Sequence, residues 1–118
     1  MIQCKRVYDD IDERDGYRVL VDRLWPRGVR KDLLHADAWC KTLAPTSDLR
    51  QALHQGLIDF ATFAQAYQAE LSLSSPHIVA HLREIASRQT LTLLYASKER
   101  QKNHAIILAQ FLTSGDMP

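Results

Sequence analysis

Two short apolar segments, far apart in the chain, place the strongest constraint on the fold. Tyr17–Asp22 contains three consecutive apolar residues, and Thr90–Ala96 ends in four. Runs of this kind are typical of strands that are covered on both faces, as in parallel sheets. Ile2–Tyr8 is a further, weaker candidate strand. Because the two main strands are distant in sequence, we expect them to pair in parallel through a crossover connection.

Helical signals fill most of the stretch between the two main strands. Ser75 followed by Pro76 is a typical helix start, and Phe60–Leu71 places its apolar residues at helical spacing. From such signals, the expected helices cover Thr46–Gly56, Phe60–Leu71, Pro76–Ala86 and Glu99–Leu112, with a further short helix near Ala36–Lys41 and with Gly115 and the tail beyond the last helix.

The composition suits one domain. A chain of 118 residues with 46% hydrophobic content can bury one core and is too short for two domains. The predicted fold class is therefore α/β. We expect a single small layered domain over residues 1–118, with a short, mostly parallel sheet flanked by helices.

The same sequence limits location and cofactors. No apolar run approaches the ~20 residues of a membrane span, and Met1–Lys5 lacks the apolar core of a signal peptide, so a cytoplasmic location is expected. Cys4 and Cys40 form no C-x-x-C motif and are expected to be free, buried thiols. His77 and His81 have the spacing of a metal-binding helix face, but the HExxH pattern is absent. We predict no metal site and no cofactor.

The run Asp22–Gly28, directly after the second strand, is the most informative candidate for function. Pro26 fixes its own φ and keeps Trp25 extended, and the final glycine permits a positive φ, so the loop is stiff. Arg23 and Arg27 lie within it, and guanidinium groups match carboxylate or phosphate oxygens in pairs. The loop is therefore a candidate anion site.

A second basic loop, Ser97–His104, follows the strand Thr90–Ala96. Ligand sites of parallel sheets form beyond the carboxyl ends of the strands, so this loop is expected to lie beside the first one. Lys98 supplies a point charge, and His104, near the start of the last helix, can shuttle a proton near neutral pH. The two loops predict a local positive site on a chain whose net charge is only +1.

The predicted site has two kinds of residue. The candidate catalytic residues are His104, as acid or base, and Asp22, which would orient a basic side chain or serve as a base. The candidate ligand-binding residues are Arg23, Trp25, Arg27, Arg50, Lys98 and Asn103. The favoured hypothesis is a small anionic ligand bearing phosphate or carboxylate, with hydrolysis or transfer at phosphorus as the reaction if the protein is an enzyme.

Three other interpretations fit the same residues. The basic loops can follow a nucleic-acid backbone, although the near-neutral net charge makes this the second choice. Trp25 with its flanking arginines can anchor a protein partner, since Trp and Arg dominate interface hot spots. In a purely structural interpretation, Arg23 and Arg27 pair with the acidic loop Asp9–Asp15 and Trp25 fills the core.

Taken together, these segments resemble a known family. The Asp22–Gly28 run looks like the signature of the small bacterial YeaO-like proteins, part of a larger grouping of domains of unknown function. The resemblance is supported by Lys5–Asp9, Gly16–Val21, Leu43–Arg50, Leu93–Lys98 and Asn103–Ala105, and it covers nearly the whole chain. It implies one α/β domain with a site formed by the two loops, and no established activity. More distant members carry Cys-His-Arg where this chain has Asn103–Ala105, so only His104 carries over.

Overall fold

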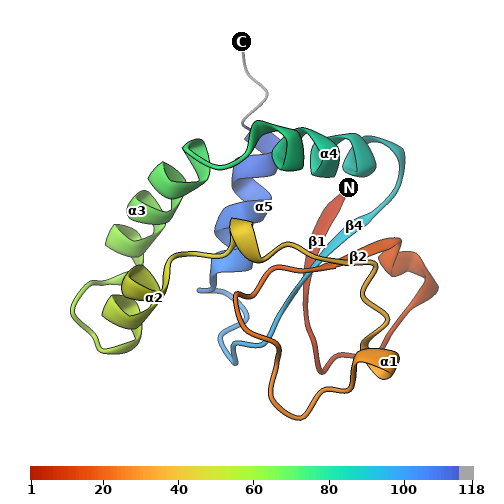
Figure 1. The fold of residues 1–118 in the computed structure, drawn as a ribbon, viewed down its shortest axis with the longest axis horizontal. Helices are drawn as coiled ribbons and strands as arrows, with labels where there is room; N and C mark the ends of the chain where they lie inside the picture. The colour runs from red at the N-terminus through yellow and green to blue at the C-terminus, as the bar shows by residue number, and fades with distance from the viewer. Residues whose placement is uncertain (115–118) are drawn as a thin grey trace.

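The fold is described by a computed structural model over residues 1–114, and the tail from Gly115 lies outside the described residues. Its strands are β1 (Ile2–Arg6), β2 (Tyr17–Leu20), β3 (Ala38–Trp39) and β4 (Leu91–Tyr95). Its helices are α1 (Lys31–Leu34), α2 (Ser47–His54), α3 (Phe60–Ser72), α4 (Pro76–Arg88) and α5 (His104–Ser114), with short 3-10 turns at Glu13–Asp15 and Lys41–Leu43 (Figure 1).

The four strands form one sheet in the order β1-β4-β2-β3, and every neighbouring pair is parallel. β4 lies between the other two long strands, with Leu93 in register with Cys4 on one side and Val19 on the other. All five residues of β4 are buried, which explains its apolar run. The expected small α/β domain and the parallel pairing of the two main strands are confirmed.

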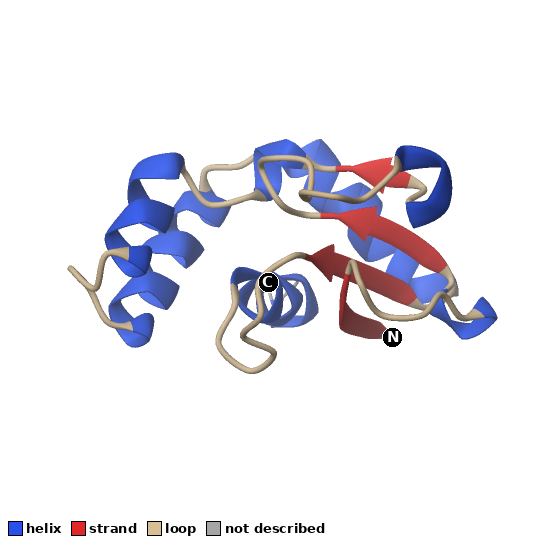
Figure 2. Ribbon diagram, turned by 90° about the horizontal axis from the view of Figure 1, so that it is seen from below, coloured by secondary structure: helices blue, strands red, loops and turns tan. Residues whose placement is uncertain are grey.

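One face of the sheet is covered by helices. Val19 and Leu93 point to this face, where they join a core with Tyr67 of α3, Leu82 of α4 and Leu108 of α5. α5 lies beside β1 and β4, and α3 packs against α5. The hairpin of α2 and α3 therefore stands at one end of the molecule, with α5 between it and the strands (Figures 1 and 2).

The opposite face of the sheet carries a smaller core. Side chains alternate between faces along a strand, so Leu20 and Leu94 point here, where they pack with Val7 and Leu34. This face is covered by residues 21–37, the segment between β2 and β3. Within this segment the one helix is α1, which has four residues. The sheet is thus flanked by long helices on one face and by a mostly irregular segment on the other.

The expected short helix near Ala36–Lys41 is wrong. These residues contain the edge strand β3, which pairs with β2, and the Cys40 N–H donates to the Leu20 carbonyl at 2.9 Å. The helical turns lie on either side, in α1 and in Lys41–Leu43. Pairing with an existing strand decides the structure of this short segment, because its own sequence has no strong periodicity.

The last helix begins at His104, five residues later than the expected start at Glu99. Asn103 sets this start, because its Oδ1 accepts a hydrogen bond from the Ile106 N–H at 3.1 Å, as in a helix N-cap. Its Nδ2 also donates to the Glu99 carbonyl at 2.7 Å, which holds the preceding loop in place.

Within residues 1–114, no helix is both long enough and apolar enough to span a membrane. Cys4 and Cys40 are free and partly buried. Burial raises the pKa of Cys4 to about 11 and also raises the pKa of Cys40. Because the thiolate is the reactive form of cysteine, neither residue is an activated nucleophile.

Candidate functional site at the ends of β2 and β4

The loops that follow β2 and β4 meet at Asp22 and His104. Asp22 lies just beyond β2, and its Oδ2 accepts a hydrogen bond of 3.0 Å from the N–H of Ala96, just beyond β4. His104 begins α5 and places its Nε2 3.0 Å from Asp22 Oδ1 and 3.1 Å from the Val21 carbonyl oxygen. The two predicted catalytic residues are therefore direct neighbours.

This meeting point lies where the chain leaves the sheet in opposite directions. After β2 the chain crosses to β3 over the face that carries Leu34. After β4 it turns into α5, which packs on the other face, beside β1. The carboxyl ends of neighbouring parallel strands at a switch of this kind are where α/β proteins commonly bind ligands. Asp22 and His104 occupy that position.

Asp22 Oδ1 is an acceptor that the fold leaves without a hydrogen bond. It is fully buried and has no hydrogen-bond partner among the described residues. His104 Nε2 is close to it, but the direction of the ring N–H suits the Val21 carbonyl instead. The side chains of Asp22 and His104 are only 17% and 15% exposed. Since buried polar atoms normally find partners, this oxygen marks a position where stability has not been optimised.

Tyr67 of α3 lies against the same histidine. The two rings are edge-to-face, with centroids 6.3 Å apart, and the Tyr67 hydroxyl donates to the Leu43 carbonyl. Burial raises the pKa of Tyr67 well above its usual range, and the charges of Glu70 and Asp22 add to the effect. Tyr67 therefore stays neutral at pH 7 and packs against the His104 ring. Sequence reasoning missed this contact, because helical spacing marks Tyr67 only as a core residue.

Arg23 is fixed by main-chain oxygens of the loop that precedes α2. Its Nε donates to the Pro45 carbonyl at 3.2 Å and its Nη2 to the Ala44 carbonyl at 3.3 Å. Arg6, at the end of β1, is held in the same manner by the Ser97 and Ala96 carbonyls, at 2.9 and 3.3 Å. In both guanidinium groups Nη1 makes no hydrogen bond within residues 1–114. Sequence reasoning missed Arg6, because its role depends on where the loop after β4 runs.

The other predicted cationic side chains are not held in place by polar contacts. Arg27, Arg50 and Lys98 are exposed, and their side chains make no hydrogen bond or ion pair in the described part of the chain. Arg27 is anchored only through its carbonyl, which accepts a hydrogen bond from the Tyr8 hydroxyl at 3.1 Å. No contact joins any of these three side chains to His104.

Trp25 and Asn103, the remaining predicted ligand-binding residues, make structural contacts. The Trp25 indole N–H donates to the Val29 carbonyl at 2.6 Å, and its ring packs edge-to-face on Trp39 with centroids 5.3 Å apart. Trp25 is half-buried against the smaller core. Asn103 is 3% exposed, and its amide is engaged at both ends by the cap of α5 and the Glu99 carbonyl.

The acidic loop takes different partners from the arginines of the Asp22–Gly28 run. Asp9 binds Arg100 of the loop after β4 through two hydrogen bonds, at 2.8 and 3.0 Å. The Arg100 guanidinium lowers the pKa of Asp9 to about 2. Asp15 pairs with Lys5 and Arg18. The acidic loop therefore leaves Arg23 and the exposed Arg27 unneutralised.

Two further features lie away from this position. A surface pocket near the amino ends of β1 and β4 is lined by Met1, Gln3, Arg14 and Thr90, among others, and by none of the predicted site residues. Within residues 1–114, no three His, Cys, Asp or Glu side chains are grouped closely enough to hold a metal ion.

Comparison with known proteins identifies the family. Residues 1–115 match the family described as "Inactive DUF488-N3 subclade". The chain belongs to this family. The match spans both loops of the candidate site, and the description of this DUF488-N3 subclade as inactive bears on what the site can be expected to do.

The resemblance to YeaO-like proteins is also confirmed. This DUF488-N3 protein is 50% identical over 113 residues to the "Uncharacterized protein YeaO" of Escherichia coli K12, covering 96% of this chain and 97% of that protein. It is 43% identical over 111 residues to "Uncharacterized protein Rv3073c" of Mycobacterium tuberculosis and "Uncharacterized protein Mb3100c" of Mycobacterium bovis, covering 94% of this chain and 92% of each. No solved structure gives a significant match.

Proposed function

We propose that this DUF488-N3 protein binds a small anionic ligand, bearing phosphate or carboxylate, at the carboxyl ends of β2 and β4, beside Asp22 and His104. The observation that carries the proposal is the placement of the Asp22–His104 pair at the point where the chain leaves neighbouring strands in opposite directions. Ligand sites of parallel sheets form at such points because the diverging chain leaves space between the loops.

Fixed positive charge supports an anion as the ligand. Arg23 and Arg6 are each held by two carbonyl oxygens, so their guanidinium groups are positioned before a ligand arrives. Within residues 1–114, Nη1 of each makes no hydrogen bond. A positioned guanidinium loses little side-chain entropy when it binds an oxyanion. Lys98, exposed in the loop after β4, adds a mobile charge.

We propose that the site binds its ligand without catalysing hydrolysis or transfer. The family description calls the subclade inactive. Asn103, beside His104, is committed to capping α5, and Cys4 and Cys40 have pKa values raised by burial. The residues around His104 therefore offer binding groups and no activated nucleophile.

A thermal-shift titration at low salt tests this function. Sulfate, phosphate, citrate, a mononucleotide and a short oligonucleotide are added to the wild type and to Arg6→Ala, Arg23→Ala and His104→Gln. At a ligand concentration of about 100 times Kd, binding stabilises the folded state by roughly 2.7 kcal/mol, a shift of several degrees for a domain of this size. His104→Gln should lose most of the shift, and the two cation variants should each lose part of it.

Arg88→Ala is the matched control. Arg88 lies at the end of α4, just before β4 begins, and pairs with Glu84 on the surface, so the variant removes the same charge at the opposite edge of the sheet. It should keep the full shift. If Arg88→Ala loses as much of the thermal shift as the site variants, the shift depends on net charge and not on the site. A shift with the oligonucleotide alone would favour nucleic-acid binding. No shift with any anion would overturn the proposed function.

A further inference from the structure

The position of the proton on His104 follows from what surrounds its Nε2. The Val21 carbonyl oxygen lies 3.1 Å away and Asp22 Oδ1 lies 3.0 Å away. Both are acceptors. If Nε2 were unprotonated, its lone pair would face two oxygen lone pairs at these distances. The neutral imidazole of His104 therefore carries its proton on Nε2.

The other ring nitrogen is not fully buried. Nδ1 of His104 makes no hydrogen bond within the described residues. Among these residues, Asp22 Oδ1 is the one side-chain nitrogen or oxygen that is fully buried without a hydrogen-bond partner, so Nδ1 is in contact with solvent. In the neutral ring, Nδ1 thus presents a lone pair outward from the Asp22–His104 pair.

We propose that anion binding at this site is coupled to the uptake of one proton by Nδ1 of His104. The inference rests on the proposed function and specifies how it is regulated. An anion repels a lone pair, whereas a protonated Nδ1 donates a hydrogen bond to it. The proton comes from water or buffer, and no other bond forms or breaks. The resulting imidazolium lies between the Asp22 carboxylate on one side and the anion on the other, each of which favours the charged ring.

The other ionisable groups near the ring are already committed. Tyr67 of α3 is neutral, with its hydroxyl on the Leu43 carbonyl. Glu70 of the same helix accepts hydrogen bonds from the Thr46 N–H and hydroxyl. The remaining charges named for the site, Arg6, Arg23 and Lys98, are cations. The proton exchange therefore belongs to His104, with Asp22 as its fixed counter-charge.

The first test measures the free protein. Long-range ¹H–¹⁵N NMR correlations of the histidine rings show which nitrogen of His104 is protonated, and the signal is assigned by its loss in His104→Gln. The wild type should show the proton on Nε2. In Asp22→Asn the Val21 carbonyl oxygen still faces Nε2, so the proton should stay on Nε2. Asp48→Asn, an exposed position on α2, should leave the tautomer unchanged.

The second test measures proton uptake on binding. Sulfate is the probe, because it carries no proton of its own near neutrality. Calorimetric titrations are run over a range of pH, each in two buffers of different ionisation enthalpy. Where the free ring is neutral, the wild type and Asp48→Asn should take up about one proton per sulfate, and their affinity should fall about tenfold per pH unit. Asp22→Asn removes the counter-charge beside the ring, so it should bind sulfate more weakly than the wild type at the same pH.

The two tests fail in different ways. A wild-type spectrum with the proton on Nδ1, or sulfate binding with the same enthalpy in both buffers, would overturn the coupling while leaving anion binding intact. If sulfate and the other anions do not bind, the proposed function fails and the coupling fails with it, whereas the NMR result on the His104 tautomer stands on its own.

Discussion

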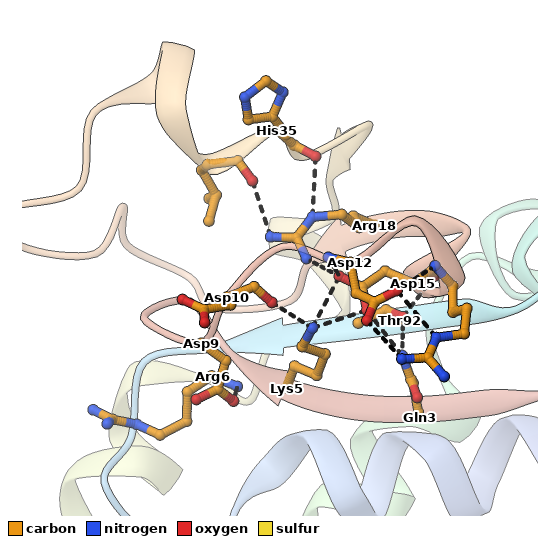
Figure 3. A network of polar contacts seen from close by, with 12 residues as sticks. Gln3, Lys5, Arg6, Asp9, Asp10, Asp12, Asp15, Arg18, His35 and Thr92 are labelled. Carbon is orange, nitrogen blue, oxygen red and sulfur yellow. Dashed lines mark hydrogen bonds and ion pairs between the residues drawn. The ribbon is translucent and has the colours of Figure 1, made fainter.

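Two aspartates at opposite ends of β2 differ in how many hydrogen bonds their carboxylates accept. Asp15, just before the strand, is buried, and its carboxylate accepts hydrogen bonds from Lys5 at 2.9 Å and from Arg18 at 2.5 Å (Figure 3). Asp22, just after the strand, accepts one hydrogen bond, from the Ala96 N–H, and leaves Oδ1 without a partner. Both carboxylate oxygens of Asp15 accept hydrogen bonds, whereas only one carboxylate oxygen of Asp22 does.

The network around Asp15 ties the acidic loop to three strands. Gln3 of β1 and the Asp12 N–H also donate to its carboxylate, and the Thr92 hydroxyl of β4 donates to its carbonyl at 2.6 Å. Arg18 continues the network to the Leu34 and His35 carbonyls. Burial alone would raise the pKa of Asp15, but the hydrogen bonds from Lys5, the Asp12 N–H and Arg18 lower it overall.

The contrast separates two uses of buried polar groups. A network in which every acceptor is engaged fixes one conformation and contributes to stability. An acceptor left without a partner costs stability and is retained where the site needs hydrogen-bonding capacity. We therefore expect the amino end of β2 to serve stability and the carboxyl end to carry the proposed site.

The largest expected effect comes from Asp15→Asn. The change leaves Lys5 and Arg18 without their counter-charge, and the Arg18 side chain is only 5% exposed. Removing one partner of a buried ion pair typically costs about 3–5 kcal/mol. Urea denaturation of the variant should show a loss of unfolding free energy in this range.

Asp22→Asn is the matched change at the other end of the strand. It keeps the hydrogen bond to the Ala96 N–H and removes a charge that has no complete set of partners, so we expect its unfolding free energy to change by less than about 1 kcal/mol. If Asp22→Asn is as destabilising as Asp15→Asn, the expected distinction between the two ends of β2 is wrong.

The next largest effect is expected for Gly16→Ala, which tests how tightly the acidic loop is closed onto the sheet. Gly16 has a φ of +63°, and a Cβ atom there would lie 2.2 Å from the Thr90 carbonyl oxygen. Strain and collision together should cost about 2 kcal/mol or more in a thermal or urea melt. Gly28→Ala is the control, with a φ of +77° but open space around the position, and should cost about 1 kcal/mol. Equal losses would show that the contact with Thr90 contributes nothing.

Sequence reasoning predicts the elements whose structure depends on burial. The apolar runs of β2 and β4 identify the central strands, and the rule for parallel sheets places the loops after them together. The edge strand β3 escapes prediction, because two residues become a strand only through pairing with β2. The start of α5 escapes it as well, because Glu99 and the following residues have helical propensity, and the cap at Asn103 decides the boundary.

The polar contacts are harder to predict than the fold. The sequence indicates that Asp22 and His104 lie near one another, since Asp22 ends one predicted main strand and His104 ends the loop that follows the other. It does not indicate that Asp15 pairs with Lys5 and Arg18, because that choice depends on the register of three strands. The sequence favours Arg23 and Arg27 equally, yet the structure engages the side chain of Arg23 alone, because the Ala44 and Pro45 carbonyls lie within its reach.

The smallest effect is expected for the ion pair between Asp9 and Arg100, which joins the loop after β1 to the loop after β4. Arg100 is 58% exposed, so the pair should contribute less than about 1 kcal/mol. The pKa of Asp9 is lowered to about 2, mainly by the hydrogen bond from Arg100. A lowered pKa in the folded state adds stability above the unfolded-state value of about 3.9, and this stability is lost as the pH falls toward about 2.

The measurement is the difference in unfolding free energy between the wild type and Asp9→Asn, followed from about pH 7 to pH 3 at low salt. The wild type should be more stable at neutral pH, and the difference should shrink below about pH 4 as Asp9 becomes protonated. Asp15 titrates in both proteins, so its effect cancels in the difference. Arg100→Ala should remove the same pH-dependent part, and the double variant should add little. A difference that stays constant down to pH 3 would mean that Asp9 stabilises the loops through its hydrogen bond to the Arg6 N–H, which an asparagine oxygen can also accept, and not through its charge.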